Sequence, residues 1–288
     1  MIANPISGRG RSRRRADRVA ARLRELGCEV DLRFTAAAGD ATRLAAAVDG
    51  HDAVVAVGGD GTINEVLNGL PEDGPPLATV PAGTANVFAK ELGLARDTAR
   101  LADAIAGGAE RRWDLAVRGD GRKFLLFASA GYDAAIVDRF LARREGTILM
   151  SDYIAWGLRS LLDFEAPDIR VEVDGELVEA RASWVEVANV AAYGGPLVLA
   201  PDAAPDDGLF DVMIQTAHRR RDAMRLIFAG LVRYFTRGRY PMRDLRRVRG
   251  RRVKLTSDAR VAIQIDGEPA GALPAEFEMR EGGVRVLG

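Results

Sequence analysis

One stretch near the start of the chain, Val54–Glu65, combines the features of a phosphate-binding turn. It reads Val-Val-Ala-Val-Gly-Gly-Asp-Gly-Thr-Ile-Asn-Glu, with three glycines in four residues after a β-branched run. The run is too short for a helix and suits a buried parallel strand. Glycines let backbone N–H groups approach a ligand, and a helix N-terminus adds unpaired N–H groups. Thr62 and Glu65 have capping-box spacing, which predicts a helix beginning at the turn.

Asp60 is the unusual member of this turn, because a carboxylate repels phosphates. It fits a phosphate site if it holds Mg²⁺ or if it hydrogen-bonds the turn, and both readings stay open. The common phosphate-loop sequence, G-x-x-x-x-G-K-S/T, is absent from the chain. A plain strand–turn–helix connection is the alternative for the whole stretch.

Composition narrows the class of protein. The 288 residues suit two domains, and 41 basic residues balance 41 acidic ones, so net charge does not favour a nucleic-acid partner. With one cysteine, Cys28, and two histidines, neither a disulfide framework nor a His-rich zinc site is expected. No apolar run reaches about 18 residues, and no signal peptide is recognisable. We expect a cytoplasmic protein, with a first strand that lacks a few residues at its start.

The first 112 residues alternate strand and helix patterns, which predicts a parallel sheet with helices on both faces. Ligands of such sheets bind at the carboxyl ends of the strands, where the turns after Val57 and Val80 both lie. The expected strands are 1–3, 28–34, 54–57 and 77–80, and the expected helices are 16–26, 40–48, one beginning at Thr62, 87–92 and 98–106.

From Trp113 the apolar residues recur with period two, which is typical of antiparallel strands. Gly119–Gly121 and Asp174–Glu176 have the composition of hairpin turns. We expect a β-sandwich over residues 113–288, interrupted by helical insertions at 150–162 and 222–235. The expected strands are 113–118, 123–128, 169–173, 177 onward, 184–190, 209–215, 252–256, 261–265, 277–280 and 284–287.

Further motifs follow the glycine turn, and together they resemble the diacylglycerol kinase catalytic-domain family, which includes sphingosine and ceramide kinases. The Gly-Gly-Asp-Gly turn alone is shared with NAD kinases and phosphofructokinases, whereas the ordered set is more specific. The set comprises Asn4–Gly8, Gly58–Thr62 with Asn64 and Glu65, Pro81–Asn86, Gly131–Ala134, Tyr193–Gly195, Ala200–Pro201, Asp207–Asp211 and Asp266–Glu268.

The resemblance implies a fold like that of NAD kinase and diacylglycerol kinase. An α/β nucleotide-binding domain would span 1–112 and a β-sandwich lipid-substrate domain 113–288, with the last strand packing back on the first domain. ATP would lie in the cleft between them. For Thr35 an ordinary strand-end threonine is the alternative. The implied ATP contacts are Asn4, Pro5, Ser7, Gly8, Thr35, Gly58, Gly59, Asp60, Gly61, Thr62, Asn64, Gly83, Thr84 and Asn86.

The same resemblance implies a catalytic base at the Asp266-Gly267-Glu268 turn, alongside a catalytic Asp60. A carboxylate suits a base, but spacing does not choose between Asp266 and Glu268. The residues alone would also suit an ordinary hairpin turn, and the identical tripeptide at Asp174–Glu176 is interpreted as one.

An acidic loop, Ala200–Asp211, would by itself be read as solvated. The resemblance implies a structural Mg²⁺ there, held by the Asp207 carboxylate and by the carbonyl oxygens of Ala204 and Leu209. Such oxygen ligands match a hard cation.

The segment Arg219–Arg252 holds thirteen arginines and two acids around an apolar stripe. It suits either docking on anionic lipid headgroups or a core-packed helix with solvated arginines. The insertion from Arg143 to Leu162 matches a family region near the lipid site, so we expect acyl chains between it and the sandwich.

We therefore expect an ATP- and Mg²⁺-dependent kinase that converts diacylglycerol to phosphatidic acid. It would meet the lipid peripherally at the inner membrane face and could pair into a homodimer through sandwich edge strands. A soluble-substrate kinase of the NAD-kinase type and a non-catalytic lipid- or nucleotide-binding relative are the alternatives.

Overall fold

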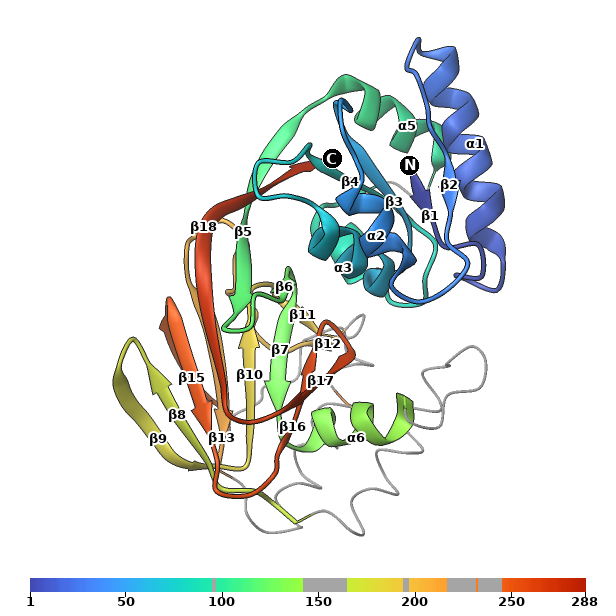
Figure 1. Cartoon of the computed structure of the whole chain (residues 1–288). Coiled ribbons are helices and arrows are strands. Elements are labelled where there is room, and N and C mark those ends of the chain that lie inside the picture. Colours follow the sequence, from blue (N-terminus) through green and yellow to red (C-terminus); the bar gives the residue numbers. More distant parts are fainter. Residues whose placement is uncertain (95–96, 142–164, 194–196, 217–231, 233–244) are drawn as a thin grey trace. The chain divides into compact units, whose positions relative to one another are not determined.

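The computed structural model describes the chain except residues 95–96, 142–164, 194–196, 217–231 and 233–244 (Figure 1). Both predicted helical insertions fall almost wholly within these gaps, so those two predictions lie outside the described residues. Within the part that is described, no helix is long and apolar enough to cross a membrane.

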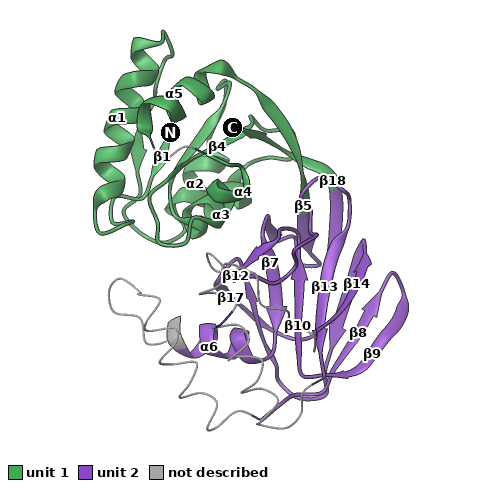
Figure 2. Ribbon diagram, turned by 180° about the vertical axis from the view of Figure 1, so that it is seen from behind, with its two compact units in different colours: residues 1–115, 281–288 green, residues 116–280 purple. Residues whose placement is uncertain are grey.

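The described chain divides into two compact units (Figure 2). Unit 1 comprises residues 1–115 and 281–288, and unit 2 comprises residues 116–280. Each unit is described by itself below.

Unit 1 is built on parallel strands in the order β2-β1-β3-β4, followed by the end of β18. This confirms the α/β class predicted from the alternating pattern. Its elements are β1 (Ile2–Ala3), α1 (Arg11–Glu25), β2 (Arg33–Phe34), α2 (Asp40–Ala46), β3 (Val54–Gly58), α3 (Asp60–Gly69), β4 (Leu77–Pro81), α4 (Val87–Glu91) and α5 (Thr98–Gly107).

Helices cover the sheet of unit 1 because each has one apolar face. Val19 and Leu23 of α1 and Leu101 of α5 share a buried cluster with Val55 of β3 and Val80 of β4. Helices α2 and α3 pack together on the other side of the sheet (Figure 1).

Unit 2 is an antiparallel β-sandwich, as the period-two patterns predicted. One layer is the sheet β14-β13-β10-β7-β16-β17, and the other contains β6, β5, β18, β15, β8 and β9. The elements are β5 (Glu110–Arg118), β6 (Lys123–Phe124), β7 (Phe127–Ala130), α6 (Tyr132–Leu141), β8 (Ile169–Val173), β9 (Glu176–Ala182), β10 (Trp184–Ala188), β11 (Ala192–Tyr193), β12 (Leu197–Val198), β13 (Phe210–Gln215), β14 (Arg246–Gly250), β15 (Arg252–Thr256), β16 (Ala262–Ile265), β17 (Glu268–Ala272) and β18 (Ala275–Leu287).

The sandwich core lies between the two layers. Phe124 contacts Phe210 in a stacked arrangement and Phe277 edge-on, with ring centroids 6.2 and 5.8 Å apart. Valine and isoleucine side chains from both layers complete the same buried cluster. The aromatic contacts therefore join strands from both layers.

Three strands, among other elements, differ from the prediction. The expected strand 28–34 is reduced to Arg33–Phe34. The expected strands 277–280 and 284–287 form one strand, β18, because the backbone N–H of Gly282 donates to the Asp114 carboxylate at 2.7 Å and the chain continues without a turn. Strand β14 was not predicted, since three of its five residues are arginines.

Candidate functional site

Three turns meet at the carboxyl edge of the parallel sheet in unit 1. They follow β1, β3 and β4, which are neighbours in the sheet. The backbone N–H of Asn4 donates to the carbonyl of Val57 at 3.0 Å, and that of Ala82 donates to Gly58 at 2.7 Å. The parallel order thus brings together turns that the sequence separates by some twenty to fifty residues.

Glycines allow these three turns to touch. A Cβ added at Gly8 would lie 2.0 Å from the carbonyl oxygen of Ala82, and one at Gly83 would lie 2.5 Å from the Cα of Gly59. Gly58 is similarly confined by the Thr62 side chain, 2.4 Å from where its Cβ would stand. At these positions glycine is required for packing of the protein against itself, whether or not a ligand is bound.

Asp60 begins α3 and connects the second turn to the third. Its Oδ1 accepts a hydrogen bond from the backbone N–H of Phe88 at 3.1 Å, in the first turn of α4. Burial raises the pKa of Asp60, while the N–H groups of Val87 and Phe88 and the charge of Lys90 oppose that rise. The carboxylate therefore already accepts a hydrogen bond at the N-terminus of a neighbouring helix.

The capping-box interpretation of Thr62 and Glu65 is wrong. The residue preceding α3 is Gly59, and no side chain caps this helix. Glu65 instead accepts hydrogen bonds from the backbone N–H groups of Gly39 and Ala41, both at 3.2 Å, at the start of α2. The spacing was right for a cap, but the neighbouring helix offers unpaired N–H groups that compete for the carboxylate.

The other residues expected at the nucleotide lie on the same edge of the sheet. Thr35 follows β2 and is tied to β1 by a 2.9 Å hydrogen bond from its N–H to the Ala3 carbonyl. Asn86 closes the third turn, because its side chain bonds both the N–H and the carbonyl of Gly83 at 2.8 and 2.9 Å. Thr84 is exposed within that turn.

Asn4 closes the first turn in a similar way, since its Oδ1 accepts from the Ile6 N–H at 3.2 Å. Ser7 is half-buried in the same turn. Thr62 and Asn64 in α3 are both 7% exposed. Amide N–H groups and hydroxyls are thus concentrated on one edge, which is the chemistry that a polyphosphate requires.

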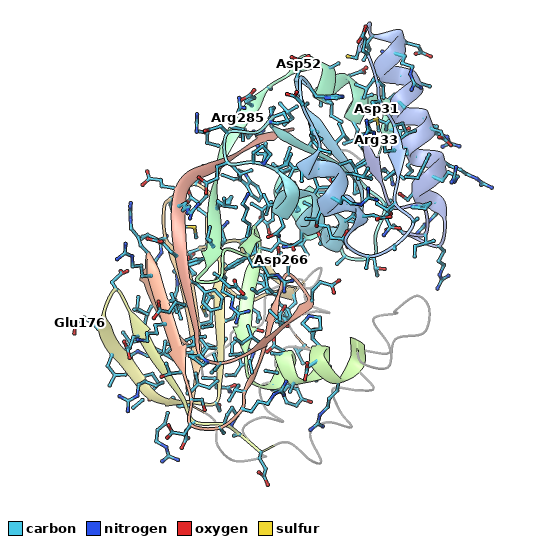
Figure 3. All side chains as sticks on the ribbon, in the orientation of Figure 1. Asp31, Arg33, Asp52, Glu176, Asp266 and Arg285 are labelled. Atoms are coloured by element: carbon cyan, nitrogen blue, oxygen red, sulfur yellow. The ribbon has the colours of Figure 1, made fainter. Side chains whose placement is uncertain are left out.

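In unit 2, Asp266 follows strand β16 (Figure 3) and is 9% exposed. Its two carboxylate oxygens accept hydrogen bonds from the backbone N–H groups of Leu125, Leu126 and Phe127, at 3.1 to 3.3 Å. Asp266 and Gly267 have φ of 49° and 82°, as the two central residues of a primed turn require. Glu268 leaves this turn as the half-buried first residue of β17.

The Asp174-Gly175-Glu176 turn has the same local conformation, with φ of 51° at Asp174 and 87° at Gly175. Asp174 also accepts from backbone N–H groups, those of Arg251 and Arg252 at 3.0 and 2.8 Å. Glu176, however, is exposed and projects from the end of a hairpin (Figure 3). The two tripeptides therefore differ in the surroundings of the glutamate and not in the turn.

The acidic loop before β13 is neutralised by arginines of β14. Arg249 donates to the Asp207 carboxylate, whose other oxygen accepts from the Leu209 N–H at 3.1 Å. Arg247 donates to Asp202 and to the buried Asp211, and this hydrogen bond to Asp211 raises the pKa of Arg247.

The Asp207 carboxylate is thus paired with the Arg249 guanidinium. Among the described residues, no three His, Cys, Asp or Glu side chains are grouped to hold a metal, but the predicted site has one carboxylate and two carbonyl oxygens and is not of that kind. A Mg²⁺ held as predicted by Ala204, Asp207 and Leu209 would have to displace Arg249 from Asp207, so the metal and the guanidinium are alternatives at this carboxylate.

Sequence reasoning missed a buried polar cluster on the outer face of the six-stranded sheet. It consists of the buried Ser129, Glu186 and Gln264 with the half-buried Asp133. One carboxylate oxygen of Glu186 has no hydrogen-bond partner, and the hydrogen bonds of the other three are described below. A signal was available, because Glu186 and Gln264 are single polar residues within otherwise apolar strands.

Several expected lipid-site residues lie outside the described part of the chain. They are the segment from Arg143 to Leu162 and most of Arg219–Arg252. Gly194 and Gly195 of the motif set also lie outside it.

Comparison with known proteins agrees with this architecture. Residues 1–117 match the family model "Diacylglycerol kinase catalytic domain", and residues 127–288 match "YegS C-terminal NAD kinase beta sandwich-like domain". The chain is 31% identical to a diacylglycerol kinase of Bacillus subtilis over 284 residues, which cover 96% of this chain and 91% of that protein. A diacylglycerol kinase of Staphylococcus saprophyticus is 28% identical, with 96% and 90% covered.

A crystal structure of a diacylglycerol kinase from Bacillus anthracis shares the fold. It superposes with a TM-score of 0.75 at 22% identity, covering 99% of this chain and 94% of that one. The chain belongs to the diacylglycerol kinase catalytic-domain family and is therefore a kinase, an enzyme that transfers a phosphoryl group.

Proposed function

We propose that this kinase transfers the γ-phosphoryl group of ATP to a lipid hydroxyl, with diacylglycerol as acceptor and phosphatidic acid as product. The observation that carries the proposal is the contact between the three turns of unit 1. It concentrates backbone N–H groups and hydroxyls at the carboxyl edge of a parallel sheet, where phosphates bind in such folds. The relatives that share both halves of the chain are named diacylglycerol kinases.

In this proposal the nucleotide is held by the residues expected from the sequence, with the Gly58–Thr62 turn against its phosphates. Mg²⁺ bound with the nucleotide would neutralise phosphate charge. Thr62 and Ser7 offer hydroxyl groups, and the N-terminus of α3 offers the partial positive charge of its helix dipole.

We assign the base to Glu268 rather than to Asp266. Asp266 already accepts from three backbone N–H groups, and taking a proton would weaken those bonds. Glu268 would remove the proton of the lipid hydroxyl as the hydroxyl oxygen forms a bond to the γ-phosphorus. The bond from that phosphorus to the bridging oxygen breaks, and ADP leaves.

We also propose that the lipid is taken from the inner face of a membrane, since the sequence of Arg219–Arg252 carries thirteen arginines against two acids. A homodimer formed through sandwich edge strands stays a prediction.

The test is a substrate panel. Purified protein is incubated with γ-labelled ATP, Mg²⁺ and one acceptor at a time: diacylglycerol in micelles, sphingosine, ceramide, an undecaprenol-type alcohol or NAD. We expect labelled phosphatidic acid. Label in another lipid would keep the lipid kinase and change its acceptor, whereas label in NAD would replace it with a soluble-substrate kinase. No product with any acceptor would favour a non-catalytic relative.

A further inference from the structure

A row of polar side chains crosses the six-stranded sheet of unit 2. Glu186 of β10 lies opposite Ser129 of β7, and Ser129 lies opposite Gln264 of β16. Their sequence neighbours point into the core, so these three side chains point to the other face. All three are at most 1% exposed. Polar groups buried this completely cost stability unless they are bonded.

Asp133, in the first turn of α6, gathers the hydrogen bonds of this row. Its carboxylate accepts from the Ser129 hydroxyl, from Trp184 Nε1 at 2.7 Å and from the Tyr193 hydroxyl at 2.6 Å. The Gln264 amide nitrogen donates to the Ser129 hydroxyl at 2.8 Å and reaches Asp133 at 3.5 Å. Donors from several strands thus hold one carboxylate in place.

The other end of the Gln264 amide reaches the turn that bears Glu268. Its Oε1 accepts from the backbone N–H of Gly267 at 2.8 Å. Gly267 has φ of 82°, and its peptide leads directly into Glu268. The Gln264 side chain therefore links the Asp133 cluster to Gly267, the residue directly before the proposed base Glu268.

We propose that Gln264 is a positioning residue for Glu268, and that Asp133 and Ser129 are its anchor. The inference rests on the proposed function of Glu268. An amide suits this place because it donates at one end and accepts at the other. An ionised glutamate at the same position would accept only, and a methionine would do neither. Misplacement of a reacting group by about 1 Å can cost roughly 100-fold in rate.

The first test compares Gln264→Met with Gln215→Met. Gln215 of β13 is also buried, at 4% exposure. It lies on the same face of the six-stranded sheet as Gln264, away from the turn that bears Glu268. We expect Gln264→Met to lower kcat roughly 10- to 100-fold, with the KM for ATP unchanged. Gln215→Met should alter only the unfolding temperature. Equal kcat in the two variants would overturn the proposal.

The second test combines Gln264→Met with Glu268→Gln. If Gln264 acts through Glu268, Gln264→Met should cost nothing further once Glu268 is removed. A full additional loss in the double variant would overturn the positioning role while leaving Glu268 as the base. A wild-type rate for Glu268→Gln alone would remove both the base and this inference.

Gln264→Glu gives a readout that a structural role would not produce. Burial beside Asp133 favours the neutral form of a glutamate, which can donate and accept as glutamine does. We expect the kcat of Gln264→Glu, divided by that of wild type at the same pH, to rise as pH falls from about 8 to about 6. A ratio that stays constant would count against the hydrogen-bond mechanism.

Discussion

A Cβ on Gly83 would stand 2.5 Å from the Cα of Gly59, so the turns after β3 and β4 touch through their backbones. Gly83→Ala should therefore push the two turns apart and destabilise the fold by about 1–3 kcal/mol. We also expect a smaller rise in unfolding temperature on addition of ATP, because the N–H groups of the turns would be displaced.

Gly107→Ala is the matched control for this change. Gly107 ends α5, and a Cβ there meets nothing within 4 Å. It should be neutral or slightly stabilising. Equal stability of the two variants in urea would show that the turns can separate without cost.

Asp60 offers a second prediction, since it joins α3 to the start of α4. Asp60→Asn keeps an oxygen that can accept from the Phe88 N–H but loses the charge. We expect nearly unchanged stability and a roughly 100- to 1,000-fold fall in turnover. Asp60→Ala should also lose about 1 kcal/mol of stability, as helix caps do. Full turnover in Asp60→Asn would leave Asp60 as a capping residue alone.

The two Asp-Gly-Glu turns provide the comparison for the base. Glu268→Gln should lower kcat roughly 100- to 10,000-fold, whereas Glu176→Gln, in a turn of the same conformation, should have no effect. Asp266→Asn should act differently and cost about 2 kcal/mol of stability, because its amide group cannot accept all three N–H bonds. Loss of turnover without loss of stability in Asp266→Asn would reverse the assignment of the base.

Glu186 should make stability depend on pH. Burial, with a contribution from the charge of Asp133, raises the pKa of Glu186 well above its ordinary value. As pH rises above about 4.5 the unfolded chain releases this proton while the folded chain retains it, so stability from this group is lost. Below about pH 4.5 the contribution of protonated Glu186 to stability is fully present.

Glu186→Gln removes this titration. We expect its advantage in unfolding temperature over wild type to grow between about pH 5 and pH 8. Glu176→Gln, on an exposed hairpin, should show no such trend. A constant difference across this range for Glu186→Gln would mean that Glu186 titrates normally.

Arg249 should make the acidic loop independent of metal. Because its guanidinium already bonds Asp207, EDTA should leave the unfolding temperature of the nucleotide-free protein unchanged. Arg249→Ala should lose about 1–2 kcal/mol, while Arg252→Ala, an exposed arginine paired with Glu278, should lose less. A fall in the wild-type unfolding temperature on EDTA, abolished by Asp207→Asn, would instead support a bound Mg²⁺.

Much of the fold could be predicted because local pattern and tertiary position agree. The run Val54–Val57 is buried throughout, and the change of period near Trp113 marks the change from helices on a sheet to a sandwich. Boundaries failed where a distant residue decided them, as when Asp114 binds the Gly282 N–H and keeps β18 continuous.

The candidate site could be predicted as a set of turns but not as a set of contacts. The glycines were interpreted as space for a ligand, whereas at Gly8 and Gly83 the space is filled by another turn. Glu65 had the spacing of a local cap and bonds α2 instead, which depends on helix packing that spacing does not encode. Gln264 carried a signal, an amide in an apolar strand, but Ser129 and Asp133, which bond its amide nitrogen, lie more than 130 residues away.

Strand β18 begins beside β15 in unit 2 and ends beside β4 in unit 1, where Leu287 joins the buried cluster. The sheet of unit 1 thus needs a strand that is translated after all of unit 2. During synthesis residues 1–115 emerge with the edge of β4 unpaired, and this edge is covered only after residues 116–280 have followed. Unit 1 is therefore begun first and completed last, and until then its β4 edge is open to pairing with a strand of another chain.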